Sequence, residues 1–113
     1  MRILDLIRKM NCEEREAGLY SEKGRLRISW NELQKKKMVC TKGKVLYAGY
    51  NSYQMEGVLV IPKTVEYIEF RTFHSCHGLT EVYMQDGVKR IGSEAFRDCD
   101  NLTKVHIPYS TTY

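Results

Sequence analysis

Apolar residues recur at a fixed spacing in the second half of the chain. Shifting the sequence by 23 residues places apolar residues on apolar residues throughout this half. The pairs that coincide are Val65 and Val88, Ile68 and Ile91, Phe73 and Phe96, Cys76 and Cys99, Leu79 and Leu102, Val82 and Val105, and Met84 and Ile107. A fixed period of this length is typical of solenoids, in which each repeat packs on the next. We therefore predict a short solenoid.

Each repeat has two parts with different hydropathy patterns. In Val82-Tyr83-Met84 and in Val105-His106-Ile107, the first and third residues are apolar and the middle residue is expected to point outward. This period of two predicts a strand for each triplet. Their apolar side chains are expected to point into the core. The segments 69–75 and 93–98 are predicted to form helical turns that carry the buried Phe73 and Phe96. Each repeat therefore contributes one strand and one helical turn.

The first half of the chain has no repeat and mixes helical with hairpin patterns. Ile3, Leu6, Ile7 and Met10 follow the apolar spacing of an amphipathic helix. The segment 29–32 is a capping box, which predicts a second short helix through Lys37. Two hairpins are predicted, one pairing residues 19–20 with 25–28 and one pairing 38–41 with 44–48.

The segment from Val88 to Pro108 resembles the repeat of the BspA-like leucine-rich-repeat family. That repeat reads V-x-x-I-G-x-x-A-F-x-x-C-x-x-L-x-x-I-x-I-P. The matching residues are Val88, Ile91, Gly92, Ala95, Phe96, Cys99, Leu102, Val105, Ile107 and Pro108. The preceding repeat departs from the pattern at Glu69, Thr72 and Gln85. The resemblance covers about residues 57–110 and implies a right-handed solenoid that binds other molecules, often proteins.

Two full repeats with a lead-in strand are too few to bury a continuous core without support. We therefore expect residues 1–56 to form an α/β cap and residues 57–113 to form the leucine-rich-repeat segment. The predicted fold class is α+β, and the two parts are expected to fold as one cooperative domain. The chain ends one strand into a new repeat, so self-association through this uncapped end, as a homodimer, is a further hypothesis.

The residue types that carry chemistry have structural explanations. Cys76 and Cys99 occupy the same repeat position, so we predict core packing for both rather than redox or metal chemistry. His74 and His77 lie three residues apart, but no further ligand has suitable spacing, so surface histidines are predicted. No nucleophile elbow, P-loop or zinc-protease motif occurs. We therefore predict no enzyme, no cofactor and no metal.

Basic residues are concentrated in one segment of a chain whose net charge is +4. Residues 23–44 hold eight basic residues and one acidic residue, Glu32. The residues assigned to this basic patch are Arg25, Arg27, Lys35, Lys36, Lys37, Lys42 and Lys44. The patch can attract phosphate or an acidic protein surface. The alternative is a solvated face, in which the three consecutive lysines complement the dipole at a helix C-terminus.

Two surfaces are candidates for binding a partner. The first is the outward side of the strand ladder, where stacked repeats align Val60, Tyr83 and His106 beside Glu81 and Lys104. The second is a loop that contains three tyrosines with serine and asparagine between them, a composition typical of antibody contact loops. Its tyrosines are Tyr47, Tyr50 and Tyr53. The alternative for these tyrosines is a structural role at the junction of cap and solenoid.

These observations favour a non-catalytic protein-binding module. A more specific version of this hypothesis is a compact inhibitor that covers a partner's functional surface. The alternative is a protein that binds nucleic acid or a ribonucleoprotein through the basic patch and the neighbouring tyrosines. No apolar run is long enough to span a membrane, and the charged N-terminal residues do not form a signal peptide. We therefore expect a cytoplasmic protein with no membrane contact.

Overall fold

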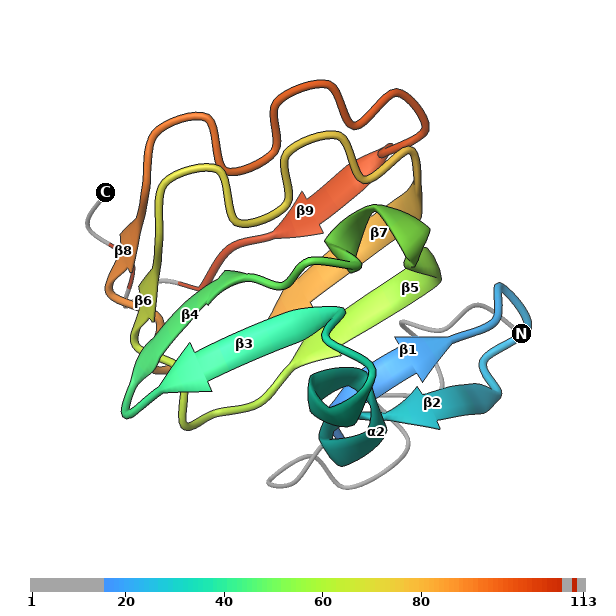
Figure 1. Ribbon diagram of the computed structural model, residues 1–113, viewed down its shortest axis with the longest axis horizontal. Helices are drawn as coiled ribbons and strands as arrows, with labels where there is room; N and C mark the ends of the chain where they lie inside the picture. The colour runs from blue at the N-terminus through green and yellow to red at the C-terminus, as the bar shows by residue number, and fades with distance from the viewer. Residues whose placement is uncertain (1–15, 109–110, 112–113) are drawn as a thin grey trace.

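A computed structural model describes residues 16–108 and Thr111 of the chain. This part is mostly β, with one short α-helix (Figure 1). The first elements are β1 (Gly18–Tyr20), β2 (Leu26–Ser29), α2 (Trp30–Lys35), β3 (Val39–Lys42), β4 (Val45–Ala48) and η1 (Ser52–Gln54). The later elements are β5 (Glu56–Ile61), β6 (Tyr67–Ile68), β7 (Gly78–Met84), β8 (Arg90–Ile91) and β9 (Lys104–His106). The helix predicted over Ile3 to Met10 lies outside the described residues.

The strands form two sheets that are neither closed nor curled. The five-stranded sheet has the order β2-β1-β5-β7-β9, and the four-stranded sheet has the order β3-β4-β6-β8. Figure 1 shows β3 and β4 in front of β5 and β7, with β6 and β8 at the left. The main core cluster takes side chains from both sheets, such as Leu46 of β4 and Leu59 of β5. The described residues before β5 add antiparallel strands to both sheets, so they extend the two sheets of the repeats.

Both predicted hairpins are confirmed. β1 pairs antiparallel with β2, and the intervening turn contains a backbone hydrogen bond from Gly24 N to Ser21 O. β3 pairs antiparallel with β4 across a turn in which Gly43 has a φ of 61°. A positive φ is readily available to glycine because it has no Cβ, so Lys42-Gly43 is a suitable turn sequence.

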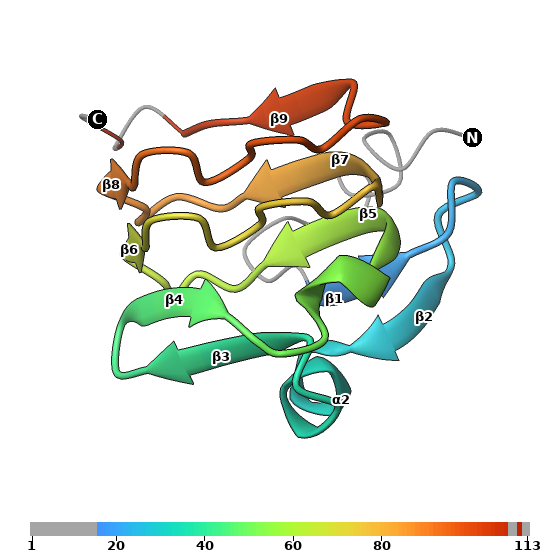
Figure 2. The same ribbon diagram turned by 45° about the horizontal axis from the view of Figure 1, so that its top comes forward.

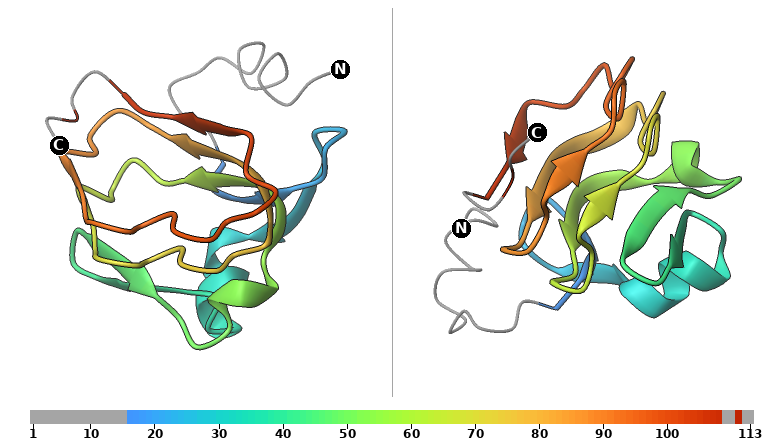
Figure 3. Two further views of the ribbon diagram at one scale, coloured as in Figure 1. Left: turned by 90° about the horizontal axis from the view of Figure 1, so that it is seen from above. Right: turned by 90° about the vertical axis from the view of Figure 1, so that its left-hand side faces the viewer.

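The predicted repeat register is confirmed by the parallel pairing of β5, β7 and β9. Leu59 pairs with Val82, and Val82 pairs with Val105. Figure 2 shows the three strands stacked in this order, and Figure 3 shows that successive repeats follow similar outlines when seen from above. Residues that occupy equivalent positions in successive repeats therefore lie directly beside each other in the sheet.

The path between these strands differs from the prediction. Each repeat adds a second short strand, β6 or β8, which extends the four-stranded sheet from β4. The segments 69–75 and 93–98 form turns instead of helical turns. Their backbones bond to each other through Arg71 N to Ser93 O, Phe73 N to Ala95 O and Ser75 N to Arg97 O. The N–H groups between them bond three residues back, as in Thr72 N to Glu69 O and His74 N to Arg71 O. Because every second N–H group of residues 71–75 bonds to the next repeat, the local bonds cannot continue into a helix.

The core contains the apolar side chains of the repeat positions predicted to be buried. These side chains become more exposed to solvent toward the last repeat. Val82 and Met84 are buried as expected, and Phe73 is fully buried and stacks on Phe96 with ring centroids 5.2 Å apart. The prediction for Ile107 is wrong, because its side chain is 52% exposed. It follows β9, which lies at the edge of the five-stranded sheet, with no further described strand beside it.

Candidate protein-binding surfaces

The predicted contact row on the strand ladder is aligned but largely inaccessible. Val60 pairs with Tyr83 and Tyr83 with His106, so the predicted alignment is correct. Val60 is 0% and Tyr83 is 5% exposed, however, and both belong to a small apolar cluster with Tyr20 and Val58. The expectation that this row is an open contact surface is therefore wrong for Val60 and Tyr83.

The polar neighbours of this row are partly buried and interact with it. Glu81 and Lys104 are paired across β7 and β9, and the Tyr83 hydroxyl donates to Glu81 Oε1 at 3.4 Å. His106 is exposed, and its ring lies 6.0 Å from that of Tyr83. The part of this row that is open to a partner is therefore limited to the His106 edge.

The tyrosine-rich loop is exposed, as expected for a contact surface. Tyr50 is 90%, Tyr53 is 58% and Tyr47 is 38% exposed. The exposure of Tyr50 and Tyr53 argues against the alternative role as a plug at the junction of cap and repeats, whereas Tyr47 lies in β4 and is more than half buried. We use the name tyrosine lobe for Tyr50 and Tyr53 on the segment 49–54, which contains η1.

The tyrosine lobe is fastened to the end of α2 by hydrogen bonds from its polar residues. Asn51 donates its backbone N–H to Lys37 O at 2.8 Å and its side-chain amide to Lys36 O at 2.9 Å. Ser52 Oγ donates to Met38 O at 2.7 Å and accepts from Gly49 N at 2.8 Å. The asparagine and serine that suggested an adaptable contact loop thus fix its backbone instead.

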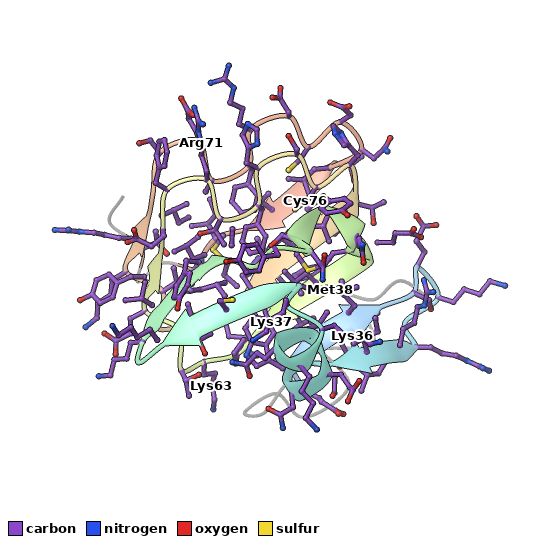
Figure 4. All side chains as sticks on the ribbon, viewed as in Figure 1. Lys36, Lys37, Met38, Lys63, Arg71 and Cys76 are labelled. Atoms are coloured by element: carbon purple, nitrogen blue, oxygen red, sulfur yellow. The ribbon has the colours of Figure 1, made fainter. Side chains whose placement is uncertain are left out.

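Gly49 permits this close approach. A Cβ atom at residue 49 would lie 2.1 Å from the Lys37 carbonyl oxygen, which no side chain can tolerate without backbone movement. The predicted proximity of tyrosines and basic residues is therefore present, and Figure 4 shows Lys36, Lys37 and Met38 at the junction between α2 and β3. Two of the predicted patch lysines, Lys36 and Lys37, are backbone partners of the lobe.

The end of α2 has the hydrogen bonds of a Schellman motif. Met38 N donates to Leu33 O, and Lys37 N donates to Gln34 O. Lys37 has a φ of 60°, the left-handed conformation that this position requires and that glycine adopts at least cost. The capping box at the other end is confirmed, because Ser29 Oγ accepts from Glu32 N at 3.3 Å.

Lys37→Gly should raise the free energy of unfolding by about 0.5–1 kcal/mol, because glycine removes the cost of a side chain in the left-handed conformation. Lys36→Gly is the matched control. Lys36 has a φ of −82°, so glycine there should lower stability by a similar amount. Urea unfolding followed by circular dichroism measures both. A shift in the same direction for both variants would contradict this assignment.

The basic patch is spread over several elements. Lys35, Lys36 and Lys37 lie at the end of α2, whereas Arg25 and Arg27 lie on the β1–β2 hairpin. Lys42 and Lys44 flank the β3–β4 turn, at the opposite end of β3 from Lys37. All seven residues are exposed, so the sequence segment is basic while its charges do not form one compact cluster.

Several charged residues near the repeats are already paired. Glu66 accepts ion pairs from Lys44 and Lys89, each with an N–O distance of 3.1 Å, and these two lysines lower the pKa of the Glu66 carboxyl. Arg71 pairs with Glu94 at 2.6 Å, which lowers the pKa of Glu94. Lys44, a member of the predicted patch, therefore has a local structural partner.

A groove crosses the outer face of the four-stranded sheet. Leu46 and Ile68 point into the core, so the residues that alternate with them, Val45 and Tyr67, lie on the outer face. Two adjoining hollows, of about 960 Å³ and about 440 Å³, share Val45, Glu69 and Phe70. The larger hollow is also lined by Tyr67, Ile68, Arg90, Ile91, Gly92 and Ser93, and the smaller by Lys42 and Tyr47.

Phe70 is the main feature of this groove, and the sequence reasoning missed it. Its side chain is 54% exposed, and the Arg71 guanidinium lies 4.8 Å from the ring centroid. Arg71 is itself held by Glu94. The repeat alignment could have revealed Phe70. The equivalent position one repeat later is Ser93, so the repeat does not require an aromatic residue there.

The cysteines and histidines of the repeats make structural contacts. Cys76 is fully buried, as predicted, and its Sγ donates to Ser52 O at 3.3 Å, while the half-buried Cys99 donates to Phe73 O at 3.0 Å. Burial raises the pKa of the Cys76 thiol to about 12. His77 lies 2.9 Å from Asp100. No group of three metal-ligating side chains occurs within residues 16–108 or at Thr111, and no helix among them could cross a membrane.

Comparison with known proteins identifies the family of the repeats. The family model described as the BspA type leucine-rich repeat region matches residues 47–113, more than half of the chain. The match extends beyond the residues on which the sequence resemblance was based, and it includes Tyr47 and the tyrosine lobe. No curated protein and no solved structure matches the chain. The chain therefore belongs to the BspA-type leucine-rich-repeat family, whose repeats generally serve protein interaction and are typically non-catalytic.

Proposed function

We propose that this chain is a non-catalytic protein-binding module whose contact surface is centred on the tyrosine lobe. The observation that supports the proposal is the exposure of Tyr50 and Tyr53, at 90% and 58%, on a backbone fixed by Asn51 and Ser52. Exposed aromatic rings on a rigid backbone lose little conformational entropy on binding. Tyrosine is also enriched among the residues that contribute most to interface affinity.

The finer form of the proposal is a compact inhibitor. A single-domain binder with no chemistry of its own can act by covering the functional surface of its partner. The lobe suits this role because it is exposed and hydrogen-bonded to the end of α2, where Lys36 and Lys37 add positive charge. The partner surface would then be apolar at its centre and acidic nearby.

The alternative function is binding of nucleic acid or a ribonucleoprotein through the same face. The proximity of Lys36 and Lys37 to the lobe favours this alternative, since lysines neutralise phosphates while tyrosine rings stack on bases. The other basic residues, on the β1–β2 hairpin and at the β3–β4 turn, would have to contact the same ligand over a wider surface. Their spread makes a protein partner the better-supported proposal.

The double variant Tyr50→Ala/Tyr53→Ala should lose the protein partner that the tagged wild-type chain captures from a native lysate. Loss of two central aromatic contacts should weaken binding at least about a hundredfold. The readout is capture followed by titration of the purified partner. The control Thr64→Ala/Asp86→Ala changes exposed corners after β5 and β7 and should bind as the wild type does.

Two further arms separate the functions. Nuclease treatment and an increase in salt from about 50 mM to about 500 mM should leave a tyrosine-centred protein complex largely intact, whereas phosphate binding should fall steeply. The variant Lys35→Glu/Lys36→Glu/Lys37→Glu should abolish binding under the nucleic-acid alternative. Retention of the partner by the tyrosine variant would contradict the proposed contact surface.

Self-association through the C-terminal repeat stays a prediction. Of the residues after Pro108, only Thr111 is described; its Oγ1 donates to Val88 O at 2.7 Å, one repeat back. A dimeric mass in light scattering at high protein concentration would support the homodimer. A monomeric mass would count against it.

A further inference from the structure

We propose that the groove on the outer face of the four-stranded sheet binds an extended segment of a partner protein in which a large apolar side chain is flanked by aspartate or glutamate. This inference rests on the proposed function, because it assumes a protein partner. It assigns a second contact surface, separate from the tyrosine lobe. Figure 4 shows Arg71, which marks the groove side, well away from Lys36 and Lys37.

The shape of the groove suits an extended chain. The two hollows share Val45, Glu69 and Phe70, so they form one continuous depression that crosses β4, β6 and β8. The larger hollow, of about 960 Å³, is open to solvent along its length, so a chain can lie across it without threading into a cavity. Beside the groove, Gly92 allows the two repeats to approach closely, because a Cβ there would lie 2.5 Å from Phe70 N.

The walls of the groove are apolar and aromatic. Val45 and Tyr67 are adjacent across β4 and β6, and Tyr47 and Phe70 line the neighbouring hollow. Exposed apolar surface of this kind is a feature of interaction sites. An apolar side chain of the partner would therefore be the anchor, since burying it between these rings removes apolar surface from water on both sides.

The fold does not require a phenylalanine at position 70. The next repeat has Ser93 at the equivalent position and keeps the same turn, so the architecture tolerates a small polar residue there. Phe70 nevertheless stands 54% exposed, with Arg71 stacked on it and Glu94 holding Arg71. An exposed ring that stacks on an ion-paired guanidinium is preorganised for contact.

The charged residues around the groove indicate which residues should flank the apolar side chain of the partner. Lys42 and Arg90 are exposed at its two ends, and neither takes part in the ion pairs found within the described part of the chain. Lys44 and Arg71 are neutralised by Glu66 and Glu94. The remaining charges are two cations and the Glu69 carboxylate, so the groove is net positive and complements an acidic segment.

Selection of a phage-displayed library of random dodecapeptides on the purified full-length chain tests this proposal. We expect enrichment of peptides with a Phe, Trp, Leu or Ile next to Asp or Glu. The best peptide, made synthetically with a fluorophore, is then titrated against variants. Phe70→Ser, which copies the residue of the next repeat, should weaken its binding at least about tenfold. Lys42→Glu/Arg90→Glu should weaken it by a similar factor.

Two controls make the outcomes separable. Circular dichroism and urea unfolding establish that each variant is folded, and chemical-shift mapping on the wild-type chain locates the peptide without any substitution. Shifts confined to the groove, within residues 42–47, 67–70 and 90–93, support the proposal, and shifts confined to the tyrosine lobe overturn it. Tyr50→Ala/Tyr53→Ala should bind the peptide as the wild type does.

The remaining outcomes also decide the proposal. Enrichment of peptides without acidic residues, equal binding by Phe70→Ser, or no enrichment at all would overturn it. Binding of a single-stranded oligonucleotide to the groove in place of any peptide would assign this surface to nucleic acid. If the groove fails while the tyrosine variant still loses its lysate partner, the proposed function stands and only this inference is wrong.

Discussion

Replacing Phe73 by alanine should lower the free energy of unfolding by about 3–5 kcal/mol, the largest effect we expect from a single substitution. Phe73 is fully buried, lies within the main core and stacks on Phe96 with an angle of 12° between the rings. Its removal leaves a cavity between two repeats whose backbones are fixed to each other by hydrogen bonds. Such a cavity can collapse only partly, so both transfer and cavity costs are incurred.

Phe96→Ala is the matched control, because it makes the same change at the same repeat position. Phe96 is only partly buried, since it belongs to the last described repeat, so its loss should cost clearly less than that of Phe73. Urea unfolding at equal protein concentration compares the two. If Phe73→Ala does not fold, Phe73→Leu and Phe96→Leu provide the same comparison with smaller cavities. An equal or larger cost at Phe96 would contradict the asymmetry of the core.

The second large effect is a loss of stability at alkaline pH that originates from Cys76. Burial raises the pKa of this thiol to about 12, whereas an unfolded cysteine ionises near pH 8.5. The native state therefore keeps its proton while the unfolded state releases it. The contribution of Cys76 to stability is complete below the unfolded pKa and is lost as pH rises toward 12. Its slope should approach about 1.4 kcal/mol per pH unit in that window.

Measuring the free energy of unfolding at several values between about pH 8 and pH 11 for the wild type and for Cys76→Ala isolates this contribution. Burial also raises the pKa of Tyr20, which titrates in the same direction, but its effect is common to both proteins. The variant should be less stable at neutral pH and lose stability more slowly as pH rises. Parallel curves for the two proteins would show that Cys76 does not ionise on unfolding. Cys99→Ala, at the half-buried equivalent position, should change the slope less.

The periodicity of the sequence determined most of the strand ladder. A shift of 23 residues places Val82 on Val105 and Tyr83 on His106, and both pairs are adjacent in the five-stranded sheet. The hairpins, the capped helix α2 and the burial of Cys76 also follow from local patterns. These features are predictable because each depends on residues close in sequence or on a repeat that pairs with its own copy.

Other features depend on contacts between distant residues. The segments 69–75 and 93–98 are turns because their backbones bond to each other, an interaction that no single repeat reveals. Val60 and Tyr83 have the alternation of outward residues, yet they are buried with Tyr20 of β1. That neighbour is brought to the ladder by the antiparallel pairing of β1 with β5.

The candidate binding surfaces also combine features that the sequence predicts with features that depend on tertiary contacts. The sequence by itself determined the family, the repeat register and the presence of several tyrosines close in sequence to lysines, because composition and spacing encode them. Only the tertiary structure decided that Asn51 and Ser52 fix the tyrosine lobe to α2 and that Phe70 joins Val45 and Tyr47 in one groove. The physical reason is that a surface is formed by side chains from separate strands, and their proximity arises only when the sheets assemble.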